Sequence, residues 1–450
     1  MPRRCRTVRW LLIPFAFFVS GSSFVHAQKG LEELERELRT KHRAILVDLL
    51  RGNVEANPNT PGHVEAISAE TEYLTRRFID PIFTYAPPGA PRTKTMTYLI
   101  EQVEIDVRQI TRSKNDVRAV AKMYTHYFCQ HARKVILSDD RRTPLSSMCL
   151  TAALVELASL GQGELGETLA ELIEEDLRKD MLTEAERLRD PDKIPNDGMK
   201  YYALRGLQTL LAQPPMPAMV PILSKEQELK VVRVLLRLIN TTRTFQEGTT
   251  TQEIDGFRVR RREAIKALAF VTTPGVPEKM DGAALTLLRV VARDSKLTPV
   301  PSIDERLEAA VGLARMKFDR DADYHPDYAA YHIGLFLNEF VTYCNTDNQK
   351  YQRPVRVYAS RLFEALDSIK IQANDPANKQ TAEEKKFALS MVELCQPVLE
   401  KLERAPDGRV NPNDVGLDKL KTWVASTRPP NALLFKGVAE STVLPPKKLE

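Results

Sequence analysis

A short pattern recurs along most of this 450-residue chain, each time where a helix is expected to begin. It consists of a basic residue, a small residue three positions later and, in most copies, an apolar residue four positions after that. In the segment 259–270, which reads VRRREAIKALAF, these positions are held by Arg261, Ala264 and Leu268. Further copies begin at Arg118, Lys200, Arg306 and Arg356, and a degenerate copy in 145–154 has Cys149 at the small position.

The spacing of this pattern follows from helix packing. Residues four apart lie on one helix face, where an alanine lets a neighbouring helix approach closely and the apolar residue fills the space beside it. The basic residue lies near the helix start, where we expect it to reach an acid in the preceding turn. The candidate acids are Asp116, Asp197, Asp255 and Asp304.

Composition supports a helical fold. Glycine is scarce, with 19 residues, and the abundant Leu, Ala, Glu and Arg favour helices. The 29 prolines fall mostly between helix-like segments rather than inside them. A hydroxyl residue followed three positions later by Glu is typical of a capping box at a helix start. Such pairs are Thr183 with Glu186, Ser302 with Glu305, and Thr381 with Glu384.

The repeated stretches resemble the second helices of HEAT-type repeats, which carry Asp, Val-Arg, Ala and Leu at these offsets. The resemblance covers residues 96–403 and implies an all-α fold, an α-solenoid in which antiparallel helix pairs of the HEAT/armadillo type form a right-handed superhelical array. The small positions lie 28 to 61 residues apart, whereas HEAT-like repeats measure roughly 40 to 47 residues. This irregularity indicates insertions, a missed helix or degenerate repeats. The resemblance implies an architecture and no activity.

The rest of the chain divides around this array. Residues 28–95 are predicted to form an N-terminal helical segment that ends in a proline-rich linker at 85–92. After residue 404 the composition shifts to Pro, Asp, Asn and Gly. We therefore expect residues 404–450 to form a loop-rich or disordered C-terminal tail with a short helix over 418–425.

The first residues have the features of a secretory signal peptide spanning 1–27. Four arginines precede the apolar run Trp10–Val19, and small residues at Val25 and Ala27 predict cleavage after Ala27. The run is short for a membrane span, and an uncleaved anchor is the alternative. We expect an exported protein of bacterial type, periplasmic or secreted, with no membrane span after cleavage.

Cleavage would also change the charge. The formal net charge of +5 includes the four arginines of the signal, so the mature chain carries +1. A near-neutral chain has no overall electrostatic attraction to nucleic acid or to an anionic membrane. We therefore predict no nucleic-acid partner.

Four cysteines remain after cleavage, and no C-x-x-C spacing links them. One interpretation is that all four are buried free thiols. The other follows from export to an oxidising compartment. Cys129 and Cys149 lie at similar distances on either side of a turn near 139–143, so a helix hairpin would bring them level and allow a disulfide.

Motifs that carry chemistry are few. The chain contains no G-x-S-x-G, S-x-x-K, H-E-x-x-H, P-loop or dinucleotide-binding glycine pattern. Two acidic stretches resemble parts of a calcium loop but lack the glycine or the closing ligand that the loop needs. They contain Asp319, Asp321 and Asp323, and Asp407 and Asp414. No metal and no cofactor are predicted.

Four of the histidines form two closely spaced pairs that could offer metal ligands. His325 and His332 are seven residues apart and would share a helix face, whereas His126 and His131 are five apart and would not. No carboxylate in the local sequence clearly completes a ligand set, so ordinary core or surface histidines are the prediction.

The favoured function is non-catalytic: an exported scaffold that mediates protein–protein interaction in the cell envelope. The resemblance implies that the motif-bearing helices line a concave surface. The candidate contact residues on them are Arg205, Arg262, Lys266 and Arg315.

Two alternatives remain open. One is an exported enzyme on an α/α-helical array that acts on polysaccharide, with an aromatic–histidine cluster converging on a deep pocket. That cluster consists of Tyr324, Asp327, Tyr328, Tyr331 and His332. The other is a calcium-tuned adhesion module built on the acidic stretches.

Overall fold

A computed structural model describes residues 30–436, except for gaps at 85–90, 92–94, 114–117, 181, 183–185, 187–189, 191–193, 214–221, 243–249, 272, 274, 276–281, 318–323, 347–354, 377, 379, 406–409 and 412–413. Several predictions lie outside the described residues: the signal peptide 1–27, most of the linker 85–92, Asp116, Thr183, Asp319, Asp321, Asp323 and Asp407. None of the described helices is long and apolar enough to cross a bilayer.

The described secondary structure is helical apart from one isolated β-bridge between Tyr324 and Phe435, which confirms the all-α prediction. The elements are α1 (Leu31–Glu37), the π-helical turn η1 (Leu38–His42), α2 (Arg43–Arg51), α3 (Pro61–Arg77), α4 (Pro81–Thr84), α5 (Met96–Arg112), α6 (Arg118–Ser138), α7 (Pro144–Glu156), the 3₁₀ turn η3 (Leu157–Leu160), α8 (Gly163–Asp180), α10 (Asp197–Leu211), α11 (Lys225–Asn240), α12 (Thr251–Leu268), α13 (Ala283–Val291), α14 (Ile303–Ala314), α15 (Pro326–Thr346), α16 (Val355–Asn374), α17 (Ala382–Arg404) and α18 (Val415–Ser426).

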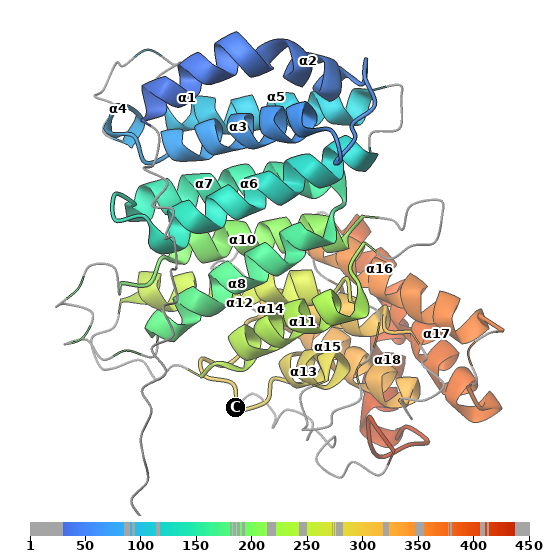
Figure 1. Cartoon of the computed structure of the whole chain (residues 1–450). Helices are drawn as coiled ribbons and strands as arrows, with labels where there is room; N and C mark the ends of the chain where they lie inside the picture. The colour runs from blue at the N-terminus through green and yellow to red at the C-terminus, as the bar shows by residue number, and fades with distance from the viewer. Residues whose placement is uncertain are drawn as a thin grey trace, which may run out of the picture.

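The helices form two parallel rows. In the first row, α3, α6, α8, α11, α13 and α15 pack in succession, and in the second row α5, α7, α10, α12, α14 and α16 do the same. Each first-row helix also packs on the second-row helix that follows it in the chain. Figure 1 shows the resulting layers, which run from the blue N-terminal helices to the orange and red C-terminal ones. The chain is therefore an α-solenoid of stacked helix pairs.

Both ends of the rows are covered. At the N-terminal end, α1, η1 and α2 pack against α3, and α2 also contacts α5. At the C-terminal end, α17 lies against both α15 and α16, and α18 packs on α17 and α15. The buried apolar residues form one continuous core along the whole array.

The repeated pattern marks the second row. Its small residues Ala203, Ala264, Ala309 and Ala359 are fully buried on α10, α12, α14 and α16. The copy at Ala121 is an exception, because α6 belongs to the first row. Ala121 and Cys149 lie on the two helices of one pair, which explains why the shortest spacing, 28 residues, falls between them.

Helix starts are fixed by side-chain caps. The capping boxes predicted at Ser302 and Thr381 are present, with each hydroxyl accepting from the backbone of Glu305 or Glu384. Three further capping boxes were not predicted, and in two of them Ser or Gln takes the place of Glu. They begin at Thr143, Ser224 and Thr250.

The short helix expected in the C-terminal tail is present as α18, and the described part of the tail packs against the array. Leu417, Leu420 and Trp423 of α18 are buried against the array, and so are Leu434 and Phe435 beyond it. The backbone N–H of His325 donates to the Leu434 carbonyl at 2.8 Å. The tail is rich in proline and polar residues. Its few large apolar residues nevertheless bury enough surface to keep it packed against the array.

Candidate interaction surface on the second helix row

Three basic residues of the repeated pattern, Lys200, Arg261 and Arg306, are buried, whereas Arg118 and Arg356 are exposed. Lys200 of α10 is fully buried and its Nζ lies 3.0 Å from Asp176 and 2.6 Å from Asp180, both on α8. It also lies 3.3 Å from Asp197, the acid predicted to pair with it. A buried ammonium needs several oxygen partners to offset its loss of hydration. Lys200 therefore joins the two helices of its pair.

Arg261 joins neighbouring pairs. Its Nε and Nη2 donate to the two carboxylate oxygens of Glu305 on α14 at 2.6 and 3.0 Å, and both side chains are fully buried. The predicted partner, Asp255, contacts Arg258 at 3.8 Å instead. The bidentate geometry is among the strongest that two charged side chains can form.

Arg306 makes the equivalent contact one pair further on. It donates to both oxygens of Glu339 on α15 at 2.8 and 2.7 Å and to the Val291 carbonyl at 2.8 Å. Its guanidinium lies over the Phe336 ring, 4.6 Å from the centroid. Asp304, the predicted partner, instead accepts from the Tyr358 hydroxyl of α16. The pattern thus places structural ion pairs inside the array.

Arginines and lysines next to these buried residues reach the surface. Arg262 and Lys266 of α12 both approach the Glu263 carboxylate, at 3.7 and 2.9 Å, and Arg262 also lies 3.7 Å from Asp304. Both are partly exposed. One oxygen of Glu263, Oε2, is buried and accepts no hydrogen bond among the described residues. Two of the four predicted contact residues therefore converge on a single acid.

The same face continues across α14 and α16. Arg315, at the end of α14, lies 3.3 Å from Glu364, and its guanidinium is 5.2 Å from the Phe270 ring centroid. Arg361 lies 2.8 Å from Glu308 and also donates to Glu364. Burial, followed by the positive charge of Arg361, lowers the pKa of Arg315 from its usual value.

We call this set of partly exposed and buried charges the charged ladder. It crosses three adjacent second-row helices, and it consists of Arg262, Glu263, Lys266, Asp304, Glu308, Arg315, Arg361 and Glu364.

Arg205 lies apart from the ladder. It is exposed on α10, and its Nη1 lies 3.4 Å from the Tyr201 hydroxyl. Sequence reasoning missed Glu308, Arg361 and Glu364. The 361–364 pair could have been found, because Arg and Glu three apart on a helix face contact each other.

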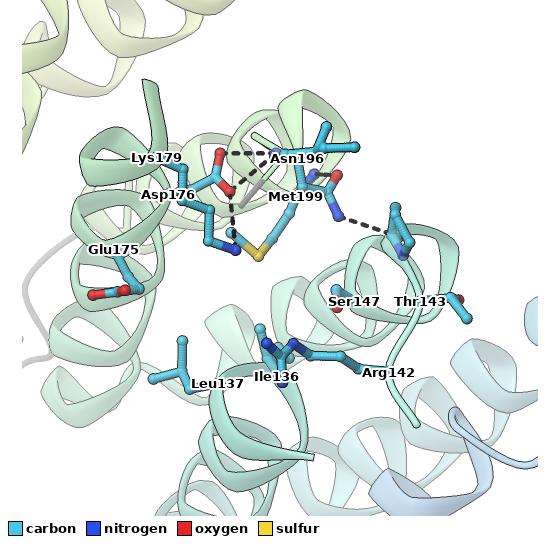
Figure 2. Close-up of a pocket in the computed structure, with 12 residues that line it drawn as sticks. Ile136, Leu137, Arg142, Thr143, Ser147, Glu175, Asp176, Lys179, Asn196 and Met199 are labelled. Atoms are coloured by element: carbon cyan, nitrogen blue, oxygen red, sulfur yellow. Dashed lines mark hydrogen bonds and ion pairs between the residues drawn. The ribbon is translucent and has the colours of Figure 1, made fainter. Parts of the chain in front are cut away.

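Three small, partly open cavities lie among the described helices. One of about 50 Å³ lies between α6, α7, α8 and the start of α10. Figure 2 shows Asp176 and Asn196 on one side of it, with Ile136 and Arg142 on the opposite side. Asp176 accepts the Asn196 backbone N–H at 2.9 and 3.0 Å, so its oxygens serve the structure rather than a ligand.

Two further cavities measure about 20 and 140 Å³. A shallow open groove of about 450 Å³ lies on α17 and α18. Ligand pockets for drug-sized molecules are typically about 300–1,000 Å³ and enclose most of the ligand. The three cavities are below this range, and the groove is open.

The proposed aromatic–histidine cluster forms a packing seam. The His332 ring lies 4.8 Å from that of Tyr328 and 5.6 Å from that of Tyr331, and burial lowers the pKa of His332 to about 4. Tyr324 packs on Phe435 and lines only the 20 Å³ cavity. Asp327 accepts hydrogen bonds from Asn431. These side chains do not converge on one deep pocket.

The predicted Cys129–Cys149 disulfide is not formed, since both residues are buried free thiols. Cys129 is directed towards Thr168 of α8, and burial raises its pKa to about 12. The helix that carries Cys149, α7, packs mainly against α5 and α10. Cys344 and Cys395 are also free thiols.

Of the acidic stretches read as calcium-like, only Asp414 is described. It caps α18 by accepting the backbone N–H groups of Gly416 and Leu417 at 2.8 and 3.3 Å, and it pairs with Lys401. Lys401 lowers the pKa of Asp414. Its oxygens are occupied by this helix cap.

Comparison with known proteins adds little. No protein-family model and no curated protein matches the chain. Among solved structures it is similar to SYS-1 in the SYS-1/POP-1 complex, with 10% identity over 90% of this chain and 76% of that one, at a TM-score of 0.30. SYS-1 alone gives 11% identity over the same shares at a TM-score of 0.29. The fold assigned here rests on the packing of the chain's own helices.

Proposed function

We propose that this chain is an exported helical-repeat scaffold that binds a protein partner through the charged ladder. The observation that carries the proposal is the ladder's continuity. Ion pairs link the three adjacent second-row helices, from Arg262 of α12 to Asp304 of α14 and from Arg361 of α16 to Glu308 of α14.

The ion pairs hold the charged side chains of the ladder in place before a partner binds. Side chains held in place before association lose less conformational freedom when a partner docks. Arginine is enriched at protein interfaces, and three arginines, Arg262, Arg315 and Arg361, lie in the ladder.

Both signs of charge occur in the ladder, so the expected partner is a protein surface or segment with acids and bases in a complementary order. Uniformly charged polymers do not match this alternation. The small cavities favour an extended contact over a small-molecule site.

Export is proposed from the first 27 residues, whose arginines, apolar run and small residues have the order of a signal peptide. Its test is direct. The mature protein isolated from the source cell is expected in the periplasmic or secreted fraction with Gln28 as its first residue, and intact Met1 in the cytoplasm would contradict export.

A crosslinked pull-down of the tagged protein, read by mass spectrometry, tests the ladder. We expect reproducible protein partners whose yield falls at least tenfold in the Arg262→Glu, Lys266→Glu double variant. The matched control reverses the exposed Lys385 and Lys386 of α17, which lie outside the ladder.

The control variant is expected to retain its partners. Equal loss in both double variants, or glycan or small molecule retained in place of protein, would contradict the proposed function. Far-UV circular dichroism confirms that each variant remains helical.

A further inference from the structure

Four potential metal ligands meet at the C-terminal end of the array. His325 and Asp327 lie at the start of α15, Glu384 lies in the first turn of α17, and Asn431 comes from the segment that follows α18. One ligand atom from each of His325, Asp327 and Glu384 lies within 4.8 Å of the others. The four residues span more than a hundred positions in sequence.

The Asn431 amide holds the two carboxylates together. Its Nδ2 donates to Asp327 at 3.0 Å and to Glu384 at 2.7 Å, and its backbone N–H donates to the other oxygen of Asp327 at 2.9 Å. His325 Nδ1 lies 3.2 Å from the same Glu384 oxygen. One oxygen of each acid therefore faces the space between the four side chains.

The charges at this point are not balanced by a strong cation. Asp327 is fully buried and Glu384 is nearly so, and among the described residues His325 alone forms an ion pair with either of them. Burial raises the pKa of Asp327 and the charge of Glu384 adds to the rise, whereas the hydrogen bonds from Asn431 oppose it. Buried charges usually require a paired charge or a metal ion.

We propose that His325, Asp327, Glu384 and Asn431 form a binding site for a divalent first-row transition-metal ion, with Zn²⁺ and Mn²⁺ as the ions to test. Two carboxylates and a divalent ion together are neutral, and His325 then binds as a neutral imidazole. A half-turn of the Asn431 amide exchanges Nδ2 for Oδ1, which converts a donor into a ligand at almost no steric cost.

The ligand set selects the class of ion. Imidazole nitrogen suits Zn²⁺ and related transition metals, whereas Ca²⁺ and Mg²⁺ favour shells built of oxygen alone. His325 remains partly exposed, with 18% of its side-chain surface accessible, so an ion can enter from solvent.

Binding would have a structural consequence. Asn431 belongs to the C-terminal segment, whereas the other three ligands belong to the array. A bound ion would therefore fasten residues 427–436 to α15 and α17, beside the contacts of Leu434 and Phe435.

The first test is calorimetric titration of the metal-free, full-length protein with Zn²⁺ and with Mn²⁺. We expect one ion per chain and at least a tenfold loss of affinity in His325→Gln and Asp327→Asn. The matched control is His126→Gln, because His126 and Glu164 form another His–Glu pair, at 3.0 Å, that belongs to no metal-ligand cluster among the described residues.

Unchanged affinity in His325→Gln and Asp327→Asn, or equal loss in the control, would refute the site. A second measurement depends on no variant. X-ray absorption at the zinc edge of the wild-type protein is expected to show one imidazole nitrogen and two or three oxygen ligands. No bound zinc, or a shell without imidazole, would show that hydrogen bonds alone satisfy the two acids.

Discussion

At the residue scale, the array depends on charged side chains that are removed from water. Arg261 and Glu305 are fully buried, and Nη1 of Arg261 has no hydrogen-bond partner among the described residues. Removing one partner of such a pair leaves the other as an unpaired buried charge, which costs far more than the loss of an exposed pair.

We predict that Arg261→Met lowers the free energy of unfolding by roughly 3–5 kcal/mol, because Glu305 is left buried and unpaired. Arg262→Met on the next position, where the arginine is partly exposed, is expected to cost less than about 1 kcal/mol. Chemical denaturation of both variants measures the difference. Equal losses would show that the Arg261–Glu305 pair has no special role.

A second buried cluster lies near the N-terminus. Glu70 of α3 is almost fully buried, and burial together with the charge of Asp106 on α5 raises its pKa to about 8. The Tyr124 hydroxyl of α6 donates to Asp106 at 3.0 Å, and burial raises the pKa of Asp106 to about 6. The cluster joins three helices through acids that favour their protonated forms.

These shifts predict that stability falls as the pH rises. The folded state binds the Glu70 proton more tightly than the unfolded state, so this contribution is complete below pH 4.5 and is lost as the pH approaches 8. Between pH 5 and 8 the wild type is expected to lose roughly 2–4 kcal/mol more than Glu70→Gln.

Denaturation at the two pH values, with the exposed Glu65→Gln on the same helix as control, measures this difference. Identical pH slopes in wild type and Glu70→Gln would rule out Glu70 as the source.

At the element scale, sequence reasoning succeeded where the signal is local. A helix start depends on residues three apart, and the boxes at Ser302 and Thr381 were predicted for that reason. The alanine of the repeated pattern also marks a helix face correctly, because that face is set by a spacing of four residues.

Long-range pairings could not be predicted. Arg261 meets Glu305 across 44 positions, and Asp327 meets Asn431 across 104. Nothing local distinguishes Glu305 from other acids, since its pairing depends on how α12 and α14 stack. The metal-ligand cluster was missed for the same reason, because neither Glu384 nor Asn431 lies near His325 in sequence.

The C-terminal segment is expected to stabilise only the C-terminal end of the array and not the helices further away. Phe435 is buried against Tyr324, 5.7 Å between ring centroids. Phe435→Ala should destabilise this contact by roughly 3–5 kcal/mol and accelerate amide exchange at the starts of α15 and α17.

In the same hydrogen-exchange experiment, α3 to α8 should be unaffected, because stability in repeat arrays is transmitted between neighbours. Ile371→Ala, at an exposed apolar position of α16, is the control. Faster exchange throughout the chain would mean that the array unfolds as one unit.

At the scale of the whole molecule, the stacking of helix pairs could be predicted from the sequence. The assignment of the pattern-bearing helices to one row or the other could not. The copies identified in the sequence lie on second-row helices, apart from the copy on α6, so they marked mainly that row. The predicted contact residues are only partly brought together. Arg262 and Lys266 both approach Glu263, whereas Arg205 lies away from the charged ladder, next to Tyr201.

The covered ends of the two rows have a consequence for assembly. A bare end would present unburied apolar helix faces onto which another copy could stack, and copies would then join into fibres of indefinite length. Here α1–α2 at one end and α17–α18 at the other expose charged side chains outward, among them Glu32, Arg39, Lys419 and Lys421. The covered ends of the described array therefore oppose the end-to-end stacking of further copies.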